Sequence, residues 1–347
     1  MVTITSPKIL NLALQGGGSH GAYTWGVLDR LLEEDNLTIE GISGTSAGAM
    51  NAAALLEGHC KGGNQGAKDA LEKFWLGVAD LSTFGFGDSS SFQKMFGGFS
   101  FNVDYSPAAA LTDAWTRMFS PYQTNPFNYN PLRDLLSKMI DIDAIRACKA
   151  IKVFICATNV ENGRTKIFSR DELTVDALMA SACLPFTFQA VMIDGVPYWD
   201  GGYSGNPAIF PLIYGCESPD VAIVQINPLT RKGIPENPTD ILNRLNEISF
   251  NASLISEMRA IAFVERLVEE DHLKSTEAAR LKKMNMHVIG AEDELSKLGA
   301  SSKSNTSRDF LLQLKAIGRH AADQWLTANW QNIGEQSSVD VRQMFLD

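Results

Sequence analysis

The sequence lacks a long hydrophobic run. A membrane-spanning helix needs about 20 mostly apolar residues in succession, and every window of that length here contains polar interruptions. The apolar stretch near the N-terminus, residues 9–14, is broken by Asn11 and ends in glycines, so it does not have the basic segment and long apolar run of a secretory signal. These absences predict a cytoplasmic protein without a membrane span.

Positive charge is also scarce. The 347 residues include 30 Lys and Arg against 40 Asp and Glu, which gives a net charge of −10. Nucleic acid is excluded as a partner, because binding to phosphates requires a basic surface that displaces counterions. Most of the acidic excess lies in residues 1–230, with 15 basic and 23 acidic side chains. Any transient contact with a membrane must therefore be apolar or local.

Cysteines are few and form no C-x-x-C pair. The five are Cys60, Cys148, Cys156, Cys183 and Cys216. Their odd number and scatter favour single buried thiols in a reducing compartment over a disulfide framework or a zinc site. No set of metal ligands stands out either, so we expect no cofactor and no dependence on calcium or zinc.

Apolar residues are abundant, at 45% of the chain, which is enough for a large core. Short apolar runs at 8–14 and 38–43 predict buried strands, and helical spacing follows each of them, at 22–34 and 47–57. Further strands are predicted at 151–157 and 221–226. This alternation is typical of an α/β fold with a parallel-rich sheet between helices.

Two regions depart from this alternation. Residues 80–130 hold 12 of the 31 aromatic residues and only six charged ones, which indicates either a lid over an apolar pocket or an irregular part of the core. Beyond residue 230 the segments 240–270 and 307–330 have long helical patterns. We therefore predict a catalytic α/β domain over 1–230 and a mainly helical extension over 231–347 that packs on it.

The first motif with chemical meaning is the G-x-S-x-G sequence from Gly44 to Gly48, which lies between a predicted strand and a predicted helix. A nucleophile elbow requires this context, because a strained turn exposes the serine hydroxyl and small neighbours prevent clashes. The N-terminus of the following helix directs N–H groups toward the same place. Ser46 is therefore the candidate nucleophile.

The second motif is a glycine loop at 16–21, directly after the first strand. It matches the dinucleotide pattern G-x-G-x-x-G, but that site needs an acidic residue at the end of the next strand, and Glu40 comes too early. Consecutive glycines also expose backbone N–H groups that can hold a developing oxyanion. This second interpretation points to Gly16, Gly17 and Gly18.

The third motif follows a predicted β-hairpin. Asp194-Gly195 is a strong hairpin turn signal and so has a structural explanation. Asp200 comes at the end of the second hairpin strand, before Gly201 and Gly202. From the local sequence, Asp200 is either another turn residue or a carboxylate that points into a cleft.

These motifs together resemble the patatin-like phospholipases over roughly residues 9–230. The matching blocks, in the family's order, are 16–21, 44–48, Ala180–Pro185 with Phe188, and Asp200–Gly202 with Asn206-Pro207. The resemblance implies a three-layer α/β/α fold and a Ser-Asp dyad, with Ser46 as nucleophile and Asp200 as base.

The resemblance also implies an oxyanion hole from the backbone of Gly16, Gly17 and Gly18. Further motif glycines that it implies are Gly21, Gly44, Gly48, Gly201 and Gly202. His20 departs from the family, which often carries Arg or Lys at this position of the loop.

A Ser-Asp-His triad is the main mechanistic alternative, since His272, His287 and His320 all follow Asp200 in the chain. His272 and His320 have the charged surroundings of solvated helix residues. His287 is the best triad candidate, although a histidine in a partly buried strand explains it better. A malonyl-transferase type of protein has a related fold and a serine elbow, but the Asp-Gly-Gly block is not expected there.

The prediction is a serine hydrolase of carboxylic esters of lipids, of the phospholipase A or lysophospholipase type, that acts through an acyl-enzyme. Two alternatives stay open. One is hydrolysis of another acyl ester or thioester, such as a storage polyester or an acyl-CoA. The other is a non-catalytic regulatory or binding module that retains the fold.

Overall fold

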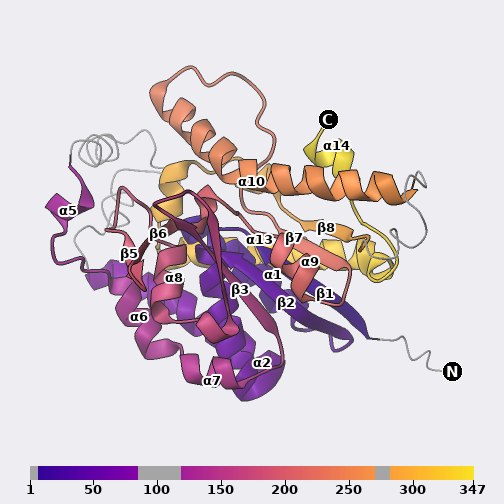
Figure 1. Cartoon of the computed structure of the whole chain (residues 1–347), viewed down its shortest axis with the longest axis horizontal. Coiled ribbons are helices and arrows are strands. Elements are labelled where there is room, and N and C mark those ends of the chain that lie inside the picture. The colour runs from indigo at the N-terminus through magenta and orange to yellow at the C-terminus, as the bar shows by residue number, and fades with distance from the viewer. Residues whose placement is uncertain (1–6, 85–118, 270–281) are drawn as a thin grey trace.

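An eight-stranded sheet forms the centre of this computed structural model, which describes residues 7–84, 119–269 and 282–347 (Figure 1). Its strands are β1 (Lys8–Leu14), β2 (Leu37–Thr45), β3 (Lys152–Asn159), β4 (Thr165–Ser169), β5 (Val191–Ile193), β6 (Val196–Asp200), β7 (Asp220–Val224) and β8 (Asn285–Ile289). The strand order is β5-β6-β3-β2-β1-β7-β8, and β4 pairs with β3 outside this path. The four strands predicted from apolar runs are all present.

The sheet is parallel from β3 through β2, β1 and β7 to β8. Antiparallel pairing is confined to one side, where β3 pairs with β4 and β6, and β6 with β5. The β5–β6 hairpin turns at Asp194 and Gly195, which both have positive φ, of 51° and 80°. Two left-handed residues in succession are what a tight hairpin needs, so the predicted turn is confirmed.

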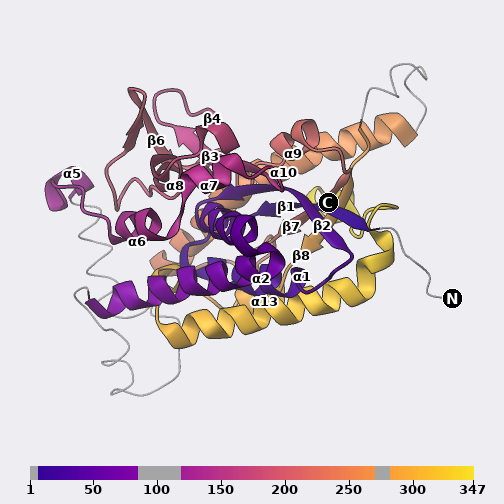
Figure 2. The same cartoon turned by 90° about the horizontal axis from the view of Figure 1, so that it is seen from below.

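Helices cover both faces of the sheet because side chains alternate along each strand. Leu10, Leu12 and Leu14 belong to the core beneath one set of helices, whereas Ala13 belongs to the core beneath the other. The first set comprises α1 (Gly21–Leu31), α2 (Ala47–Phe84) and α13 (Arg308–Asn329), and the second α9 (Phe210–Gly215), α10 (Pro238–Glu269) and α14 (Val341–Phe345). Figure 2 shows these layers, and the fold is the predicted three-layer α/β/α arrangement.

The C-terminal region shares the sheet and the core of the rest. Its strand β8 pairs with β7, and α13 lies along α1. Close contact between these helices depends on Gly26 and Gly318, since a Cβ on either would collide with a backbone carbonyl of the opposite helix. The division at residue 230 stays a prediction about domain organisation.

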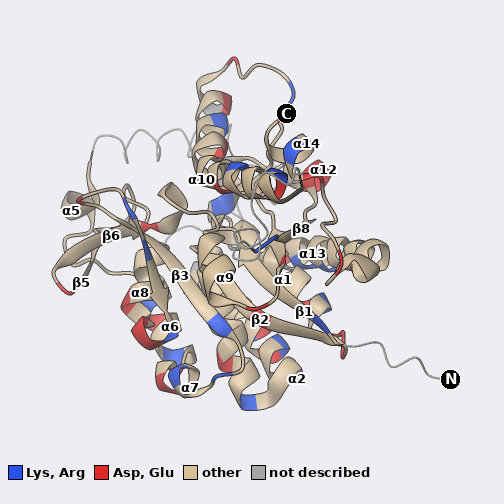
Figure 3. Ribbon diagram, turned by 45° about the vertical axis from the view of Figure 1, so that its right-hand side comes forward, with Lys and Arg blue, Asp and Glu red and all other residues tan. Residues whose placement is uncertain are grey.

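Shorter helices surround the antiparallel side and the C-terminal region. They are α5 (Pro121–Thr124), α6 (Pro131–Met139), α7 (Ile142–Ala147), α8 (Val175–Ser181) and α12 (Glu292–Leu295). Figure 3 shows basic and acidic residues interspersed along the ribbons of α6, α7 and α10. No helix in the described ranges has the length and hydrophobicity of a membrane span.

Helix α2 extends well beyond the predicted segment 47–57. It contains a break at Gly62 and Gly63, where the φ of Gly63 is 59°. Only glycine adopts the backbone angles of Gly63 without strain, so this glycine pair permits the break in the helix.

A disulfide joins Cys60, just before this break, to Cys148 after α7, with the two Cα atoms 5.8 Å apart. The prediction of five single thiols is therefore wrong for these two residues. The two cysteines are separated by 88 positions in the sequence, so no local pattern indicates the pairing, and the packing of α7 beside α2 brings the sulfurs together. Cys156, Cys183 and Cys216 are buried free thiols, as predicted.

Most of the aromatic-rich segment 80–130 lies outside the described residues, which resume at Phe119. Its role as a lid therefore stays a prediction. His272, one of the histidines considered for a triad, also lies outside the described ranges.

Candidate active site

Ser46 lies at the turn between β2 and α2, and it is one of the few non-glycine residues with a left-handed backbone, with φ of 53°. A non-glycine residue in this conformation is strained, and such strain is typical of functional turns. Two glycines make the turn possible. A Cβ at Gly44 would lie 2.7 Å from the carbonyl oxygen of Gly48, and one at Gly48 would collide with the carbonyl of Leu14.

The backbone of Ser46 is also held from outside the turn. Its N–H donates to the hydroxyl oxygen of Ser181, at the end of α8, over 2.9 Å. Ser46 is 9% exposed, so solvent reaches little of this residue. Ser181 belongs to the Ala180–Pro185 block, and the structure gives this block a contact with the elbow.

Asp200 ends β6 and is completely buried. Its backbone N–H donates to the carbonyl oxygen of Cys183 at 2.8 Å, and the Thr158 hydroxyl donates to the carbonyl oxygen of Asp200 at 2.8 Å. Its Oδ1 accepts the N–H of Gly202 at 2.7 Å. Its Oδ2 is buried and has no hydrogen-bond partner among the described residues. Asp200 therefore caps the turn at Gly201–Tyr203 through Oδ1 and leaves Oδ2 without a described partner, which is costly for a buried carboxylate oxygen.

Strand register brings Asp200 to the side of Ser46. β3 lies between β2 and β6, with Thr45 opposite Cys156 and Ala157 opposite Asp200. Burial raises the pKa of Asp200 to about 6, and the N–H of Gly202, the nearby Ser46 hydroxyl and the charge of Lys303 limit the rise. A carboxylate with this pKa is mostly ionised at pH 7 and more basic than an exposed aspartate.

The glycine loop lies against the serine turn. A Cβ at Gly16 would be 2.7 Å from the Cβ of Ser46, so only glycine allows this approach. The N–H of Gly16 donates to Oδ1 of Asn206 at 2.6 Å and is therefore already occupied. The N–H groups of Gly17 and Gly18 have no partner among the described residues. Of the three predicted donors, these two are the ones available to a ligand.

The remaining motif glycines lie at close contacts in the same region. A Cβ at Gly21 would be 2.6 Å from that of Ala47, while Cβ atoms at Gly201 and Gly202 would collide with the Cys156 carbonyl and the Phe250 ring. These glycines permit tight packing around the turn and the end of β6.

Among the described histidines, His287, His320 and His20 do not pair with Ser46 or Asp200. His287 is buried in β8 with Nε2 3.0 Å from Oδ1 of Asp220, and β1 and β7 separate β8 from β2. His320 is exposed on α13, as expected. His20 is buried in the glycine loop with Nε2 2.7 Å from the Ser302 hydroxyl. Burial and the charge of Lys303 lower the pKa of His20 to about 3, so its ring is neutral at physiological pH.

Two residues that contact the glycine loop, Asn227 and Lys303, belong to no motif by which the sequence could have indicated a role in the site. Asn227 follows β7, and its Nδ2 donates to the carbonyl of Gly16 over 2.9 Å. Lys303 comes from η4 (Ala300–Ser304), and its Nζ donates to Oδ1 of Asn227 over 2.9 Å. Because both residues are more than 200 positions from the loop in the sequence, no sequence pattern predicts this contact.

The fold and site define an α/β/α protein with a strained serine between a strand and a helix, a buried carboxylate beside it and a glycine loop against it. The model of the family described as patatin-like phospholipase matches residues 12–213. This match spans more than half of the chain, and the chain belongs to the patatin-like phospholipase family, a family of lipid acyl hydrolases.

Individual relatives are more distant. An uncharacterized protein of Acanthamoeba polyphaga mimivirus is 25% identical over 215 residues, which are 58% of this chain and 61% of that protein. The chain thus spans about three fifths of that relative. The crystal structure of VipD from Legionella pneumophila is similar with a TM-score of 0.37 and 17% identity, over 90% of this chain and 67% of that one.

Proposed function

We propose that this protein hydrolyses carboxylic esters of lipids, with Ser46 as nucleophile and Asp200 as general base. The observation that carries the proposal is the pairing of a strained serine with a buried carboxylate that has one oxygen unpaired. Family membership supports lipid esters as the substrate class.

In the acylation step, Oδ2 of Asp200 accepts the proton of the Ser46 hydroxyl while Oγ attacks the ester carbonyl carbon. The carbonyl oxygen becomes an oxyanion. When the C–O bond to the alcohol breaks, the proton on Asp200 passes to the leaving alkoxide, and an acyl-Ser46 ester remains. Burial assists because it makes the carboxylate a stronger base.

The N–H groups of Gly17 and Gly18 are the proposed donors to the oxyanion, because no described group occupies them. Gly16 has a different role in this proposal. Its N–H holds the loop to Asn206, and its lack of a side chain leaves room for Ser46. Fixed donors of this kind contribute on the order of 3–4 kcal/mol to the transition state each.

Deacylation repeats the same steps with water. Asp200 accepts a proton from a water molecule that attacks the acyl carbon, and the second tetrahedral intermediate is held by the same two N–H groups. The proton then returns to Oγ of Ser46 as the acid leaves. A histidine is unnecessary in this scheme, and His287 is engaged with Asp220.

The apolar surroundings support a lipid acyl chain. Leu184, Phe186 and Tyr203 are 40%, 69% and 44% exposed, although they lie within a few residues of Cys183 or Asp200. Exposed aromatic and aliphatic side chains beside a buried site are typical of surfaces that contact apolar ligands or membranes. They also support the proposed transient membrane contact, which needs no basic patch.

The test is ester hydrolysis and fluorophosphonate labelling of three variants. Ser46→Ala and Asp200→Asn should each lose at least about 1,000-fold in kcat, an order of magnitude set by other serine hydrolases, and the Ser46 variant should take no label. Asp194→Asn is the matched control, because Asn also tolerates the left-handed turn of the same hairpin. Hydrolysis by Ser46→Ala, or loss of activity in His287→Gln with Asp200→Asn active, contradicts the dyad.

The substrate panel separates the remaining possibilities. Phospholipid, lysophospholipid, acyl-CoA and a polyester are offered to the same preparation. Turnover of only the last two favours the thioester or storage-polyester alternative. No turnover together with no labelling favours a non-catalytic module.

We also propose the cytoplasm as location, as the sequence predicts, but the disulfide between Cys60 and Cys148 weighs against a reducing compartment. Alkylation of thiols in cells lysed directly into denaturant, with and without prior reduction, decides between a reducing and an oxidising location, because the denaturant exposes the buried thiols. Five alkylated cysteines without reductant support the cytoplasm, and three support an oxidising compartment.

A further inference from the structure

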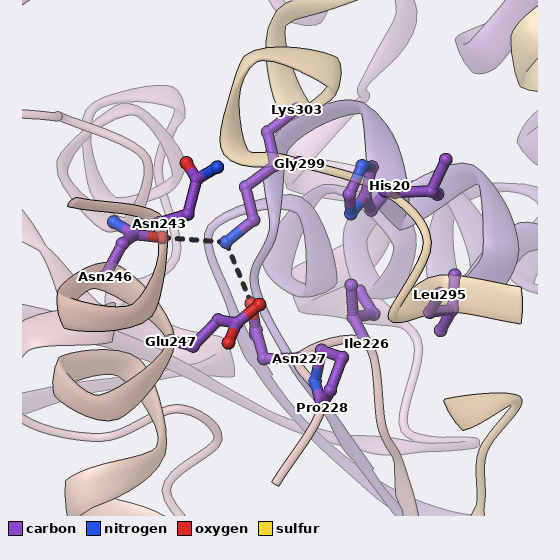
Figure 4. Close-up of a pocket in the computed structure, with 11 residues that line it drawn as sticks. His20, Ile226, Asn227, Pro228, Asn243, Asn246, Glu247, Leu295, Gly299 and Lys303 are labelled. Atoms are coloured by element: carbon purple, nitrogen blue, oxygen red, sulfur yellow. Dashed lines mark hydrogen bonds between the residues drawn. The ribbon is translucent and has the colours of Figure 1, made fainter. Parts of the chain in front are cut away.

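An ammonium group from the C-terminal region lies beside the glycine loop. The Nζ of Lys303 donates to Oδ1 of Asn227 at 2.9 Å and to Oδ1 of Asn246 at 2.8 Å (Figure 4). It also lies 5.4 Å from the centre of the Phe250 ring. The nearby carboxylate of Glu247 is instead paired with Arg231 and Arg244. The ammonium group of Lys303 thus donates hydrogen bonds to two amide oxygens and forms no ion pair with a described carboxylate.

The contact with Asn227 continues to the loop. The Nδ2 of Asn227 donates to the carbonyl oxygen of Gly16 over 2.9 Å. That carbonyl belongs to the same peptide group as the N–H of Gly17. Hydrogen bonds in series polarise each other in a low-dielectric interior, so a positive charge at Lys303 strengthens Gly17 as a donor.

The main chain of Lys303 makes a second contact with the loop. Gly18 has φ of 58°, and a Cβ there would collide with the carbonyl oxygen of Lys303. The turn η1 (Gly18–His20) therefore packs directly on η4. Lys303 is therefore connected to Gly17 through Asn227 and Gly16, and it packs directly against Gly18.

We infer that Lys303 is a positioning residue for the hydrolase reaction. Through Asn227 it orients and polarises the Gly16–Gly17 peptide, and its backbone carbonyl packs against Gly18 and fixes the position of that residue. The inference rests on the proposed function, and it assigns the region beyond residue 213 a part in transition-state stabilisation. Lys303 need not touch the substrate for this role.

The charge of Lys303 depends on pH within the working range. Burial lowers its pKa to about 8, and the negative charges of Glu247 and Asp200 limit the fall. The charged or titratable groups that face it are His20 on the loop, Asp200 on β6, and Glu247 with its partners Arg231 and Arg244. His20 is neutral, so it does not replace the lysine charge.

A purely structural role for Lys303 would lower stability, with activity falling only as far as the protein unfolds. The inferred role makes a different prediction, because stronger donors act on the transition state and not on the bound ester. Loss of the charge should therefore lower kcat and leave KM nearly unchanged.

The experiment compares Lys303→Met and Lys303→Arg with Lys297→Met, an exposed lysine of the same region, as control. We expect Lys303→Met to lose about 10- to 100-fold in kcat, somewhat less than the loss of a whole oxyanion donor, with KM within about 2-fold. Lys303→Arg should recover part of kcat, because a guanidinium also donates to two oxygens. The control should match the wild type. An unchanged kcat in Lys303→Met overturns the inference.

Asn227→Ala provides the second arm. If Lys303 acts through Asn227, the double variant should lose little more than either single variant, since both remove the same connection. Fully additive losses overturn the relay. In the wild type, kcat should fall as pH rises through about 8, and no fall between pH 7 and 9 also counts against it.

Failure of this inference is separable from failure of the proposed function. If Ser46→Ala is inactive and Lys303→Met fully active, the dyad stands and the role of Lys303 is refuted. If Ser46→Ala retains activity, the proposed function is refuted whatever Lys303 does.

Discussion

Replacing Asp200 by asparagine should stabilise the fold at neutral pH in the same step that removes activity. Burial raises the pKa of this carboxyl from 3.8 to about 6. The folded state therefore holds its proton more tightly than the unfolded state does. As pH rises from about 4 to about 6, the unfolded chain loses the proton first, and the free energy of unfolding falls.

The size of the effect follows from the two pKa values. Their difference is about 2 units, and each unit corresponds to about 1.4 kcal/mol, so ionised Asp200 destabilises the native state by about 3 kcal/mol above pH 6. Below pH 4 the carboxyl is neutral in both states and the effect vanishes. Asparagine is neutral at every pH and keeps an oxygen for the N–H of Gly202.

Urea unfolding at pH 4 and pH 7 measures this directly. The stability of Asp200→Asn relative to wild type should rise by about 3 kcal/mol between the two pH values, and pH-independent effects of the substitution cancel in that comparison. Asp194→Asn should show no such change, because it lies in an exposed turn of the same hairpin. An equal stability difference at pH 4 and pH 7 would show that Asp200 is not held ionised against burial, and the general-base argument would lose its physical basis.

Three further outcomes are expected. The kcat/KM for a neutral ester should rise with pH through about 6 and be about 10-fold lower at pH 5 than at its plateau, because Asp200 must be ionised to act as a base; a flat profile from pH 5 to 7 would exclude it. Ser46→Gly should be about 1 kcal/mol more stable than Ser46→Ala in thermal or urea unfolding, because glycine relieves the φ of 53°; the reverse order would mean that the turn is unstrained. Changing Cys60 and Cys148 to serine should lower the free energy of unfolding by about 4–5 kcal/mol, from the 88-residue separation that the disulfide closes, and an effect near zero would show that the bond does not form in the isolated protein.

The parts of the site that could be predicted are those whose residues lie close together in the sequence. Strand, glycine turn and helix occur within a few residues around Gly16 and again around Ser46, so local conformation and chemistry are visible together in the sequence. The hairpin before Asp200 is equally local, because its Asp-Gly turn needs no distant contact.

The parts that could not be predicted are contacts between segments that are distant along the chain. Gly16 was expected as an oxyanion donor, but Asn206, from a loop 190 residues later, accepts its N–H. The Cys60–Cys148 disulfide and the approach of Lys303 to Gly18 are of the same kind. None of them leaves a periodicity or spacing in the sequence.

Local sequence accounts for the α/β class, the strained serine turn and the candidate carboxylate, because the backbone preferences of glycine, aspartate and apolar runs act over a few residues. Tertiary structure decided which N–H groups remain available, how far burial raises the pKa of Asp200, and which cation faces the glycine loop. Those properties depend on desolvation and hydrogen-bond partners, and both arise only when β6, β7 and η4 pack around the serine turn.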